Sequence, residues 1–277
     1  MTPDEYCQDR AARSGSSFYY SFLFLPPQKR RAITALYAFC REVDDVVDEC
    51  ADASTARIKL AWWRNEVAGI YNGSAQHPVA KSLAAVNETF QLPQERLHDI
   101  IDGMEMDLDR NRYADFASLN TYCHRVAGVV GLLSAKIFGY QNADTLKYAH
   151  DLGIAFQLTN IIRDVGEDAR RNRVYLPLDE LQRFRVSLDD LHHARHSDNF
   201  VELMKFQIER AKQFYSRAMQ QLPAVDRSNQ RTGLIMAAIY QTTLAEIEAD
   251  GCRVLQGRIA LTPLRKLWIA WKTWLKS

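Results

Sequence analysis

The sequence predicts an all-α protein built as a single helical bundle. Apolar residues recur with helical spacing through most of the 277 residues, whereas almost no stretch alternates apolar and polar residues as a half-buried strand does. No Gly/Ser-rich linker, low-complexity tract or internal repeat divides the chain. We therefore expect one domain over residues 1–277, with any functional site inside the bundle.

The helical periodicity defines a series of segments that we expect to form amphipathic or buried helices. In chain order they are residues 30–50, 54–71, 78–90, 94–110, 115–138, 142–165, 199–221 and 228–250. Runs rich in Gly, Pro, Asn, Asp and Ser lie between several of them, as is typical where one helix ends and the next begins. In order, these runs are NGSAQHP, LPQE, RNRYAD, GYQNAD and LPAVDRS. The stretches FYYSF and RVYLP resemble strands, but they are short and isolated.

The bulk composition is that of an ordinary globular protein, with 47% hydrophobic residues, 25% charged residues and a net charge of +1. A protein built to bind nucleic acid normally carries a strong basic excess, so we expect no nucleic-acid partner. The five cysteines show no CxxC pair and no zinc-like histidine spacing, which indicates reduced, packed thiols. A solvated helix end explains the histidine cluster HHARH better than a metal site does.

The N-terminal stretch MTPDEYCQDRAARSG contains early acidic residues and no apolar core of a signal peptide. The apolar runs FYYSFLFL and VAGVVGLLSA are shorter than the ~20 residues that a membrane-spanning helix needs. We expect a cytoplasmic protein with at most peripheral contact with a membrane surface.

Two acidic clusters, REVDDVVDE and NIIRDVGED, lie in apolar, aromatic-rich surroundings more than a hundred residues apart. On a helix, Asp44 and Asp48 share one face, about 6 Å apart along the axis; we call them the first acidic row. The second acidic row, Asn160, Asp164 and Asp168, repeats this spacing over two turns. Each row therefore presents oxygen ligands that point the same way.

Buried like charges need a partner, because desolvation and mutual repulsion both disfavour them. Magnesium fits, since it prefers oxygen ligands, retains several waters and bridges one or two carboxylates to substrate phosphates. If the rows face each other across the bundle, they would hold two or three magnesium ions and a diphosphate. A solvated helix face is the alternative for either row alone, but the two rows together, in apolar settings, favour the metal site.

Several arginines lie beside the acidic rows, and the planar guanidinium suits bidentate phosphate contacts. Arg41 precedes Asp44 by about one helical turn in an apolar neighbourhood, so we expect it to bind ligand. For Arg170 and Arg171, which follow Asp168, we instead expect salt bridges to neighbouring acids.

Three ordered motifs, YxxxRxxDDxxD, YCxxVAGxVG and QLxNIIRDxxED, occur in residues 16–49, 122–131 and 153–177. These segments resemble the trans-isoprenyl diphosphate head-to-head synthases, the family of squalene, dehydrosqualene and phytoene synthases. The tail GRIALTPLRKLWIAW also fits, so the resemblance spans nearly the whole chain. The first segment is most similar to bacterial presqualene diphosphate synthases of the hopanoid pathway.

The resemblance implies an isoprenoid-synthase fold with a central cavity, and it implies roles for matching residues. Magnesium and diphosphate positions match Asp44, Asp48, Asn160, Asp164 and Asp168. Positions near the diphosphates match Ser17, Tyr37, Arg41, Gln157, Arg163, Tyr240 and Arg258. Tyr122 matches a tyrosine that the family associates with the chemical step. Some relatives carry a His and a Lys just before Ser17, where this chain has Ser14 and Ser16, which weakens the expectation of diphosphate contacts there.

The implied reaction joins two farnesyl diphosphates. Magnesium-assisted loss of one diphosphate gives an allylic cation, the double bond of the second molecule attacks it, and proton loss closes the cyclopropane of presqualene diphosphate. We expect no NADPH requirement, and possible partners are the downstream enzymes of squalene formation. The cavity must exclude water. The rings of Phe18, Phe22, Phe156 and Tyr122 are candidates to shield the cation, and ordinary core packing explains each ring equally well.

The stretch VAGVVGLL would give long prenyl chains room to bind. Val126 and Val130 are the candidate chain contacts, and Gly128 and Gly131 fall one turn apart. A glycine inside a helix lowers helix stability by about 1 kcal/mol relative to alanine, so its presence calls for an explanation. A groove for an alkyl chain and close helix packing each explain these glycines, and the two can coexist.

The C-terminal stretch RKLWIAWKTWLKS places Trp268, Trp271 and Trp274 three residues apart among lysines. That pattern suits an interfacial helix on anionic lipid, or equally a helix that caps the bundle.

Alternative functions within the family are squalene, dehydrosqualene and phytoene synthesis. A non-catalytic helical assembly protein with the same fold would tolerate loss of the carboxylates, yet both acidic rows are complete. A terpene cyclase or diphosphate hydrolase fits YCxxVAGxVG less well. The sequence therefore favours head-to-head condensation with presqualene diphosphate as the product.

Overall fold

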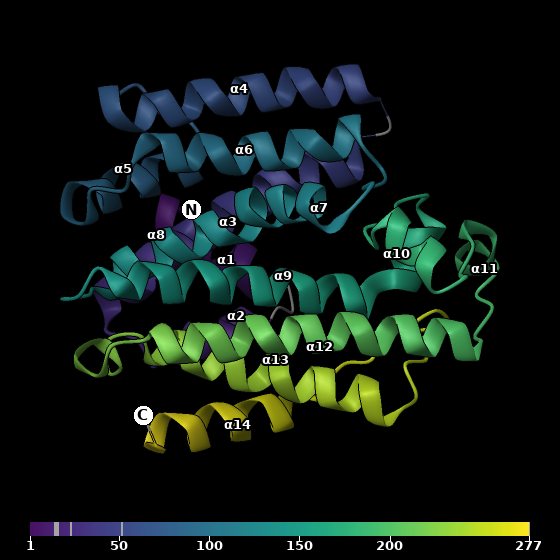
Figure 1. The fold of residues 1–277 in the computed structure, drawn as a ribbon. Coiled ribbons are helices and arrows are strands. Elements are labelled where there is room, and N and C mark those ends of the chain that lie inside the picture. The colour runs from purple at the N-terminus through teal and green to yellow at the C-terminus, as the bar shows by residue number, and fades with distance from the viewer. Residues whose placement is uncertain (14–16, 23, 51, 277) are drawn as a thin grey trace.

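The computed structural model confirms an all-α protein (Figure 1). It describes residues 1–13, 17–22, 24–50 and 52–276. Within these ranges no β-strand forms, and the β-bridge between Arg112 and Val174 stands alone. The strand-like stretch FYYSF is therefore helical, while RVYLP contributes only Val174 to that bridge.

The helices match the predicted segments closely, with four additions that periodicity did not reveal: α1, α2, α10 and α11. The N-terminal half contains α1 (Pro3–Arg13), α2 (Ser17–Phe22), α3 (Pro27–Glu49), α4 (Ala53–Asn72), α5 (Pro78–Phe90), α6 (Gln94–Asp109), α7 (Phe116–Cys123), the π-helical turn η1 (His124–Gly128) and α8 (Val129–Phe138). The C-terminal half contains α9 (Asp144–Arg170), α10 (Leu178–Arg183), α11 (Leu188–His192), α12 (Asp198–Gln221), η2 (Ala224–Asp226), α13 (Arg231–Ala249) and α14 (Pro263–Lys276).

Helix α9 lies at the centre of the bundle (Figure 1). It packs against α8 and η1 on one side and against α12 and α13 on the other. Helix α3 contacts α8 and α6, so the acidic ends of α3 and α9 belong to neighbouring layers of the same bundle. The arrangement brings together two acidic rows that are far apart in the sequence.

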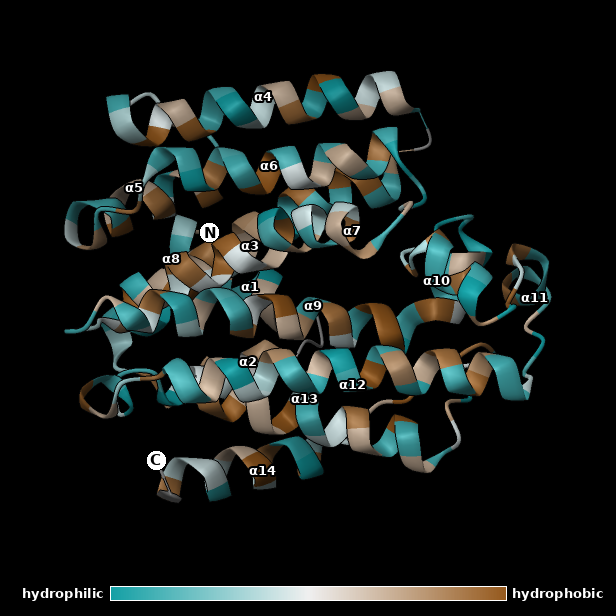
Figure 2. Cartoon of the chain, in the orientation of Figure 1, coloured by the Kyte–Doolittle hydropathy of each residue, from teal (hydrophilic) through white to brown (hydrophobic). Residues whose placement is uncertain are grey.

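The buried side chains form two hydrophobic clusters, one built mainly from the N-terminal helices and one from the C-terminal helices. Brown apolar and teal polar residues alternate along most helices in Figure 2, as amphipathic packing requires. Phe18 and Val126 pack against both clusters. This shared packing supports our proposal that residues 1–277 form one domain.

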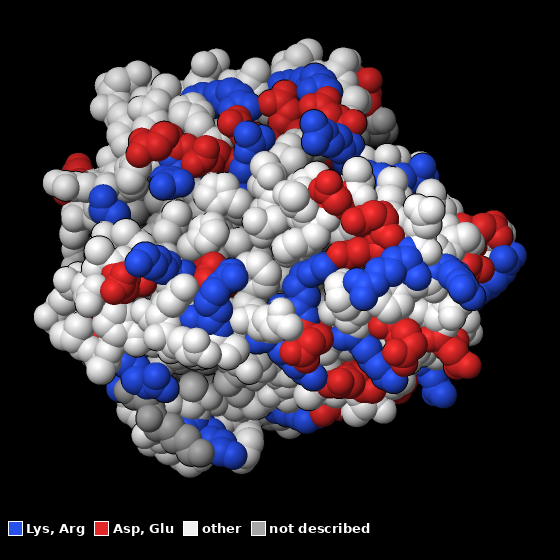
Figure 3. Space-filling model, in the orientation of Figure 1, with Lys and Arg blue, Asp and Glu red and all other residues white. Residues whose placement is uncertain are grey.

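On the face drawn in Figure 3, acidic and basic side chains are interspersed, in keeping with the net charge of +1. Among the described residues, no helix combines the length and the apolar character needed to cross a membrane.

Candidate active site

The first acidic row lies near the C-terminal end of α3, among buried valines. The core-facing residues of this turn are Val43, Val46 and Val47. Asp44 lies beside them and is partly buried, whereas Asp48 is exposed to solvent. About a third of the Asp44 side chain is exposed, at 32%. Burial, then the nearby Asp48 carboxylate, raises the pKa of Asp44 to about 6, although Arg41 acts in the opposite direction.

The second acidic row lies on the last turns of α9, where the side chains between its members are buried. Ile161, Ile162 and Val165 pack into the core and hold the row in place. Burial raises the pKa of Asp168 to about 7, and the adjacent Asp164 carboxylate adds to the shift. The row therefore combines apolar surroundings with closely spaced like charges.

Arg173 connects the two rows. Its backbone N–H donates to the carbonyl of Asp168 at 2.9 Å, which places it directly after the second row. Its guanidinium donates to Asp48 Oδ1 of the first row at 2.5 Å. Burial raises the pKa values of Asp44 and Asp168, and the positive charge of Arg173 partly opposes that rise. Arg173 thus joins the two rows, with its backbone bonded to the second row and its side chain to the first.

A second set of cations surrounds Asp164. Arg163 donates to it at 2.6 Å, and the Arg258 guanidinium lies 3.1 Å from it. The side chain of Arg163 also hydrogen-bonds Tyr240. Burial, then Arg163 and Arg258, lowers the pKa of Lys266, so this lysine of α14 belongs to the same cluster. Lys266 was not among the site residues expected from the sequence.

The arginines beside the acidic rows differ in the partners that they contact. Arg41, which we expected to bind ligand, pairs with Asp44 at 2.6 Å and with Asp45 at 2.7 Å. Arg171 forms the expected salt bridge with Glu167 and also reaches Asp48. Arg170 differs, because its recorded hydrogen bond goes to the carbonyl of Leu255. The prediction of an intrahelical salt bridge for Arg170 was therefore wrong, because the segment after α13 lies against this end of α9.

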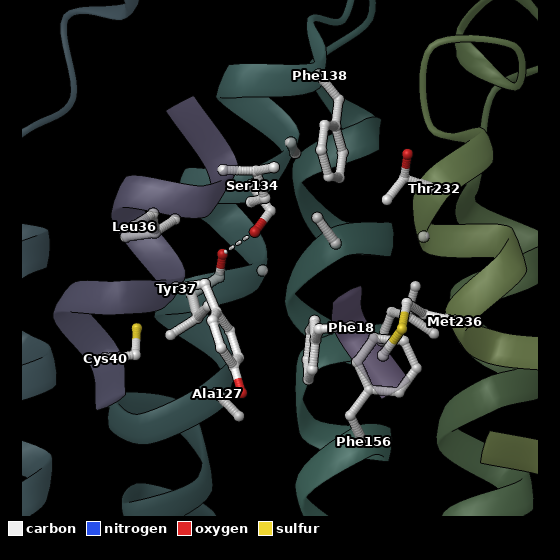
Figure 4. Close-up of a pocket in the computed structure, with 18 of the residues that line it drawn as sticks. Phe18, Leu36, Tyr37, Cys40, Ala127, Ser134, Phe138, Phe156, Thr232 and Met236 are labelled. Carbon is white, nitrogen blue, oxygen red and sulfur yellow. Dashed lines mark hydrogen bonds between the residues drawn. The ribbon is translucent and has the colours of Figure 1, made fainter. Parts of the chain in front are cut away.

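An apolar cavity of about 170 Å³ lies beside the rows, enclosed by helices α2, α3, η1, α8, α9 and α13 (Figure 4). Many of the predicted substrate contacts line it: Phe18, Tyr37, Val126, Val130, Gln157 and Asn160, together with Phe22 and Phe156. In Figure 4, Phe138 and Thr232 lie toward one end, whereas Phe156 and Ala127 lie toward the other. Because Asn160 belongs to the second row, the cavity extends from the acidic rows into the bundle.

Aromatic rings cluster around Phe18 at the wall of this cavity. The ring of Phe18 lies 5.7 Å from Tyr37, 6.1 Å from Phe156 and 6.3 Å from Tyr240, measured between centroids. Phe22 lies 6.2 Å from Phe18 on the same helix. Such rings both exclude water and present electron-rich faces to a cation.

The glycines of VAGVVG serve helix packing and also leave room in the cavity. A Cβ on Gly131 would lie 2.1 Å from the carbonyl oxygen of Ala149, so only glycine lets α8 approach α9 this closely. Gly131 also lines the cavity. Val126 and Ala127, which line it too, lie on the π-helical turn η1, an irregularity often found at functional sites.

Asp107 on α6 is a site residue that the sequence analysis missed. It accepts hydrogen bonds from the hydroxyls of Tyr122 at 2.9 Å and Tyr175 at 3.0 Å. Burial raises its pKa to about 7, and the tyrosine hydroxyl of Tyr122 and the charge of Arg173 act in the opposite direction. Burial and Asp107 raise the pKa of Tyr122 well above its usual value, so Tyr122 is a poor base by itself.

A signal for Asp107 exists in the sequence. The apolar stripe of α6 runs through Leu97, Ile100, Ile101 and Met104, and helical spacing continues that stripe to residue 107. An acid at a core-facing position needs a partner or a function. Tyr122 itself does not line the cavity but stacks on Tyr175 at a ring distance of 5.3 Å.

The predicted magnesium ligands fit a divalent cation. The side-chain oxygen Oδ1 of Asn160 is buried and has no hydrogen-bond partner, and Asp44 and Asp168 have raised pKa values. No group of three or more acidic, His or Cys side chains in the described ranges could hold an ion by itself. Magnesium bound by one or two carboxylates from each row, with diphosphate oxygens completing its shell, agrees with that finding.

Some predictions fall outside the described part of the molecule. Ser17 begins α2, but its side chain lies outside the described residues, as do Ser14 and Ser16 entirely.

The fold and this site define an all-α isoprenoid synthase: a helical bundle with an apolar cavity beneath two acidic rows. The chain belongs to the squalene/phytoene synthase family, whose family model matches residues 11–265. Members of this family are prenyltransferases that join prenyl diphosphates head to head, and they generally depend on a divalent metal. The resemblance found in the sequence motifs is thereby confirmed.

Several relatives illustrate the family. The 15-cis-phytoene synthase of Synechocystis sp. is 36% identical over 99% of this chain and 85% of its own length. The phytoene synthase of Mycobacterium tuberculosis is 38% identical over 92% of this chain and 84% of its own length.

Solved structures show the same fold. A ligand complex of a dehydrosqualene synthase superposes with a TM-score of 0.90 at 27% identity, covering 99% of this chain and 96% of that one. The squalene synthase HpnC of Alicyclobacillus acidocaldarius superposes with a TM-score of 0.80 at 27% identity, covering 90% and 94% of the two chains.

Proposed function

We propose that the protein condenses two farnesyl diphosphates head to head into presqualene diphosphate. The observation that carries the proposal is the placement of two acidic rows, bridged by Arg173, at one end of an aromatic-lined apolar cavity. A diphosphate needs cations, and a prenyl chain needs a dry apolar space. The site offers both next to each other.

Within this proposal, Asp44 and Asp48 of one row and Asn160, Asp164 and Asp168 of the other would hold magnesium. When bound, magnesium neutralises charge on a departing diphosphate and so lowers the barrier to C–O cleavage. Arg41, Arg163, Tyr240, Arg258 and Lys266 would orient the diphosphates, with Ser17, Tyr37 and Gln157 nearby. Burial, then the neighbouring Arg163 and Arg258, lowers the pKa of Lys266, which places this lysine beside the two arginines proposed to meet the diphosphates.

The chemistry requires no reductant. The donor's C–O bond breaks and its diphosphate leaves with the electron pair, giving an allylic cation. The acceptor's double bond supplies electrons to form the new C–C bond, and loss of one proton closes the cyclopropane. NADPH is therefore not part of the proposed reaction. The rings of Phe18 and Phe156 would shield the cation. Asp107, whose pKa is about 7, would fix the orientation of the Tyr122 hydroxyl outside the cavity lining.

Two buried rings at the inner end of the cavity support a C15 rather than a C20 chain. Phe138 and Tyr148 are 4% and 1% exposed and both line the cavity. The hydroxyl of Tyr148 packs directly against α13, where only a glycine at position 233 leaves room for it, since an added Cβ would lie 2.6 Å from the hydroxyl. These rings close the space at the end opposite Asn160, about 18 Å away along α9 at the rise of an α-helix.

Phytoene synthesis from two C20 diphosphates is the second candidate, because the curated relatives at 36% and 38% identity are phytoene synthases. Mass spectrometry after incubation with farnesyl or geranylgeranyl diphosphate, magnesium, and either NADPH or none separates the candidates. We expect presqualene diphosphate from the C15 substrate, unchanged by NADPH. A C40 product formed in preference, or squalene formed only with NADPH, would contradict the proposal.

The same assay tests the role of the inner end. Phe138→Ala should raise use of the C20 substrate relative to the C15 substrate by at least about tenfold, because removing a ring lengthens the space. Phe200→Ala, a fully buried ring outside the cavity, controls for loss of stability alone. An equal change of preference in both variants would show that Phe138 does not set chain length.

We further propose a cytoplasmic location with peripheral membrane contact through the C-terminal Trp/Lys segment. The apolar substrate chains and the apolar surface of that segment support this proposal. The expected partners are the enzymes that consume presqualene diphosphate, which must remove its diphosphate and rearrange its cyclopropane.

A further inference from the structure

Helix α14 exposes an unusual row of large apolar side chains. Six of them, at helical spacing, are open to solvent: Leu264 79%, Leu267 38%, Trp268 55%, Trp271 52%, Trp274 37% and Leu275 58%. The opposite face of the helix packs inward through Ile269 and Ala270, which are 8% and 0% exposed. Packing of the bundle therefore does not require the outward row. We call this row, together with Phe24, the apolar patch.

Contiguous exposed apolar surface on a protein usually marks an interaction site. Three tryptophans in one row are typical of surfaces that sit at the lipid headgroup level, where an indole can place its ring in lipid and its N–H in water.

The charge of the segment suits an anionic surface. After Asp250 the chain contains no acidic residue, whereas Arg253, Arg258, Arg265, Lys266, Lys272 and Lys276 are basic. Arg258 pairs with Asp164 and Arg265 with Glu246, so these two cations also serve contacts within the protein. Lys272 lies over the ring of Trp268 at 4.7 Å, so a positive charge sits directly beside the apolar patch. A basic helix with an exposed aromatic face has the chemistry of an anionic lipid surface.

Helix α14, which carries the apolar patch, contacts two helices that form part of the cavity wall. The ring of Phe24 stacks on Trp274 at a centroid distance of 5.8 Å. Helix α14 packs against α2 and α13, and Phe18 and Phe22 of α2 line the cavity. Figure 1 shows α14 at the outer edge of the bundle, on the side where α13 and α2 lie.

We propose that the apolar patch docks on an anionic lipid surface and that prenyl chains pass between the bilayer and the cavity along the seam between α2 and α14. The docking part stands on the exposed side chains and the charge of α14. The passage part rests on the proposed function, since it assumes a prenyl substrate. Docking would bring α14 against the lipid, and with it α2 and α13, two helices that contact α14 and line the cavity.

Co-sedimentation with vesicles tests docking without any substrate. We expect the full chain to bind vesicles of phosphatidylcholine and phosphatidylglycerol, to bind pure phosphatidylcholine weakly, and to lose binding at high salt. Trp268→Ser/Trp271→Ser should lower the bound fraction by at least about tenfold. Trp62→Ser, at a 44% exposed tryptophan on α4, is the matched control and should bind like the wild type. Equal binding by the double variant would overturn the proposal.

Turnover in two formats tests the passage. With farnesyl diphosphate in detergent micelles, the double variant should match the wild type, whereas with substrate in anionic vesicles its rate should fall by at least about tenfold. Loss of activity in both formats would contradict the passage. Absence of wild-type turnover in both formats would count against the proposed function, while the vesicle binding result would still decide docking. A concentration-dependent dimer that the double variant abolishes, seen by analytical ultracentrifugation, would instead assign the patch to self-association and overturn lipid docking.

Discussion

Asp168→Asn is expected to lower turnover by about 10²- to 10³-fold while making the metal-free protein more stable at pH 8. The loss of turnover follows because the variant removes one charge that would hold magnesium against the departing diphosphate. The gain in stability follows because the folded protein keeps Asp168 among buried side chains and close to Asp164. An amide of the same shape removes that charge, and melting temperature should rise by about 2 to 4 °C for each kcal/mol relieved.

The pH dependence of this gain has a definite sign. Folding raises the pKa of Asp168 from 3.8 to about 7, so its favourable contribution to stability is full below the unfolded pKa. That contribution is lost as the pH rises through about 7. The difference in melting temperature between Asp168→Asn and the wild type should therefore be largest at pH 8 and shrink toward pH 4.

Calorimetry in the presence of a chelator, from pH 4 to pH 8, measures the effect. The control is Asp144→Asn, at an exposed aspartate that pairs with Lys147 on the first turn of the same helix. This variant should change neither turnover nor the melting temperature appreciably. A metal-free Asp168→Asn protein that is less stable than the wild type at pH 8 would show that Asp168 has a compensating partner.

Asp107→Asn is expected to reduce kcat by about 10²-fold or more and to remove the acid limb of the pH–rate profile near pH 7. The wild-type rate should fall as the pH drops through about 7, because Asp107 gains a proton there and loses the charge that faces the Tyr122 hydroxyl. Magnesium held by the acidic rows, as we propose, would keep their carboxylates ionised in this range, so the limb should report Asp107.

Tyr122→Phe should cause a similar loss, and the double variant should lose little more than either single variant, since the two side chains act as a unit. Asp102→Asn on the same helix is the control, because that residue pairs with Arg64 at the partly exposed side. An unchanged acid limb in Asp107→Asn would show that Asp107 does not take part in the reaction. Fully additive losses of kcat in the double variant would show that Asp107 does not act through Tyr122.

Helical spacing was sufficient to predict the elements that carry the rows. Asp44 and Asp48 share a face of α3, and Asn160, Asp164 and Asp168 share a face of α9, because the period of the helix is fixed. Helices α1 and α2 were not predicted, since short segments rich in aromatic or polar residues carry little periodic signal and gain their helical state from packing.

Contacts between distant segments were harder to predict than the helices. Arg173 follows the second row in the sequence, but its contact with Asp48 depends on how α3 and α9 meet. Lys266 lies near Arg163 and Arg258 only because α14 folds back against α13 and α2. The position of Asp107 on the apolar stripe of α6 indicates a need for a partner, but it does not show that two tyrosines from other segments supply the contacts.

A crystal structure with Mn²⁺ and a non-hydrolysable farnesyl thiodiphosphate would test the central claim most directly, since manganese can be located by its anomalous scattering. We predict manganese peaks between the first and second acidic rows, ligated by Asp44 or Asp48 on one side and by Asn160, Asp164 or Asp168 on the other. The diphosphate should lie between Arg41 and Arg163, with the prenyl chain directed toward Phe138. Manganese and diphosphate bound away from both rows, with the cavity empty of the chain, would contradict the claim.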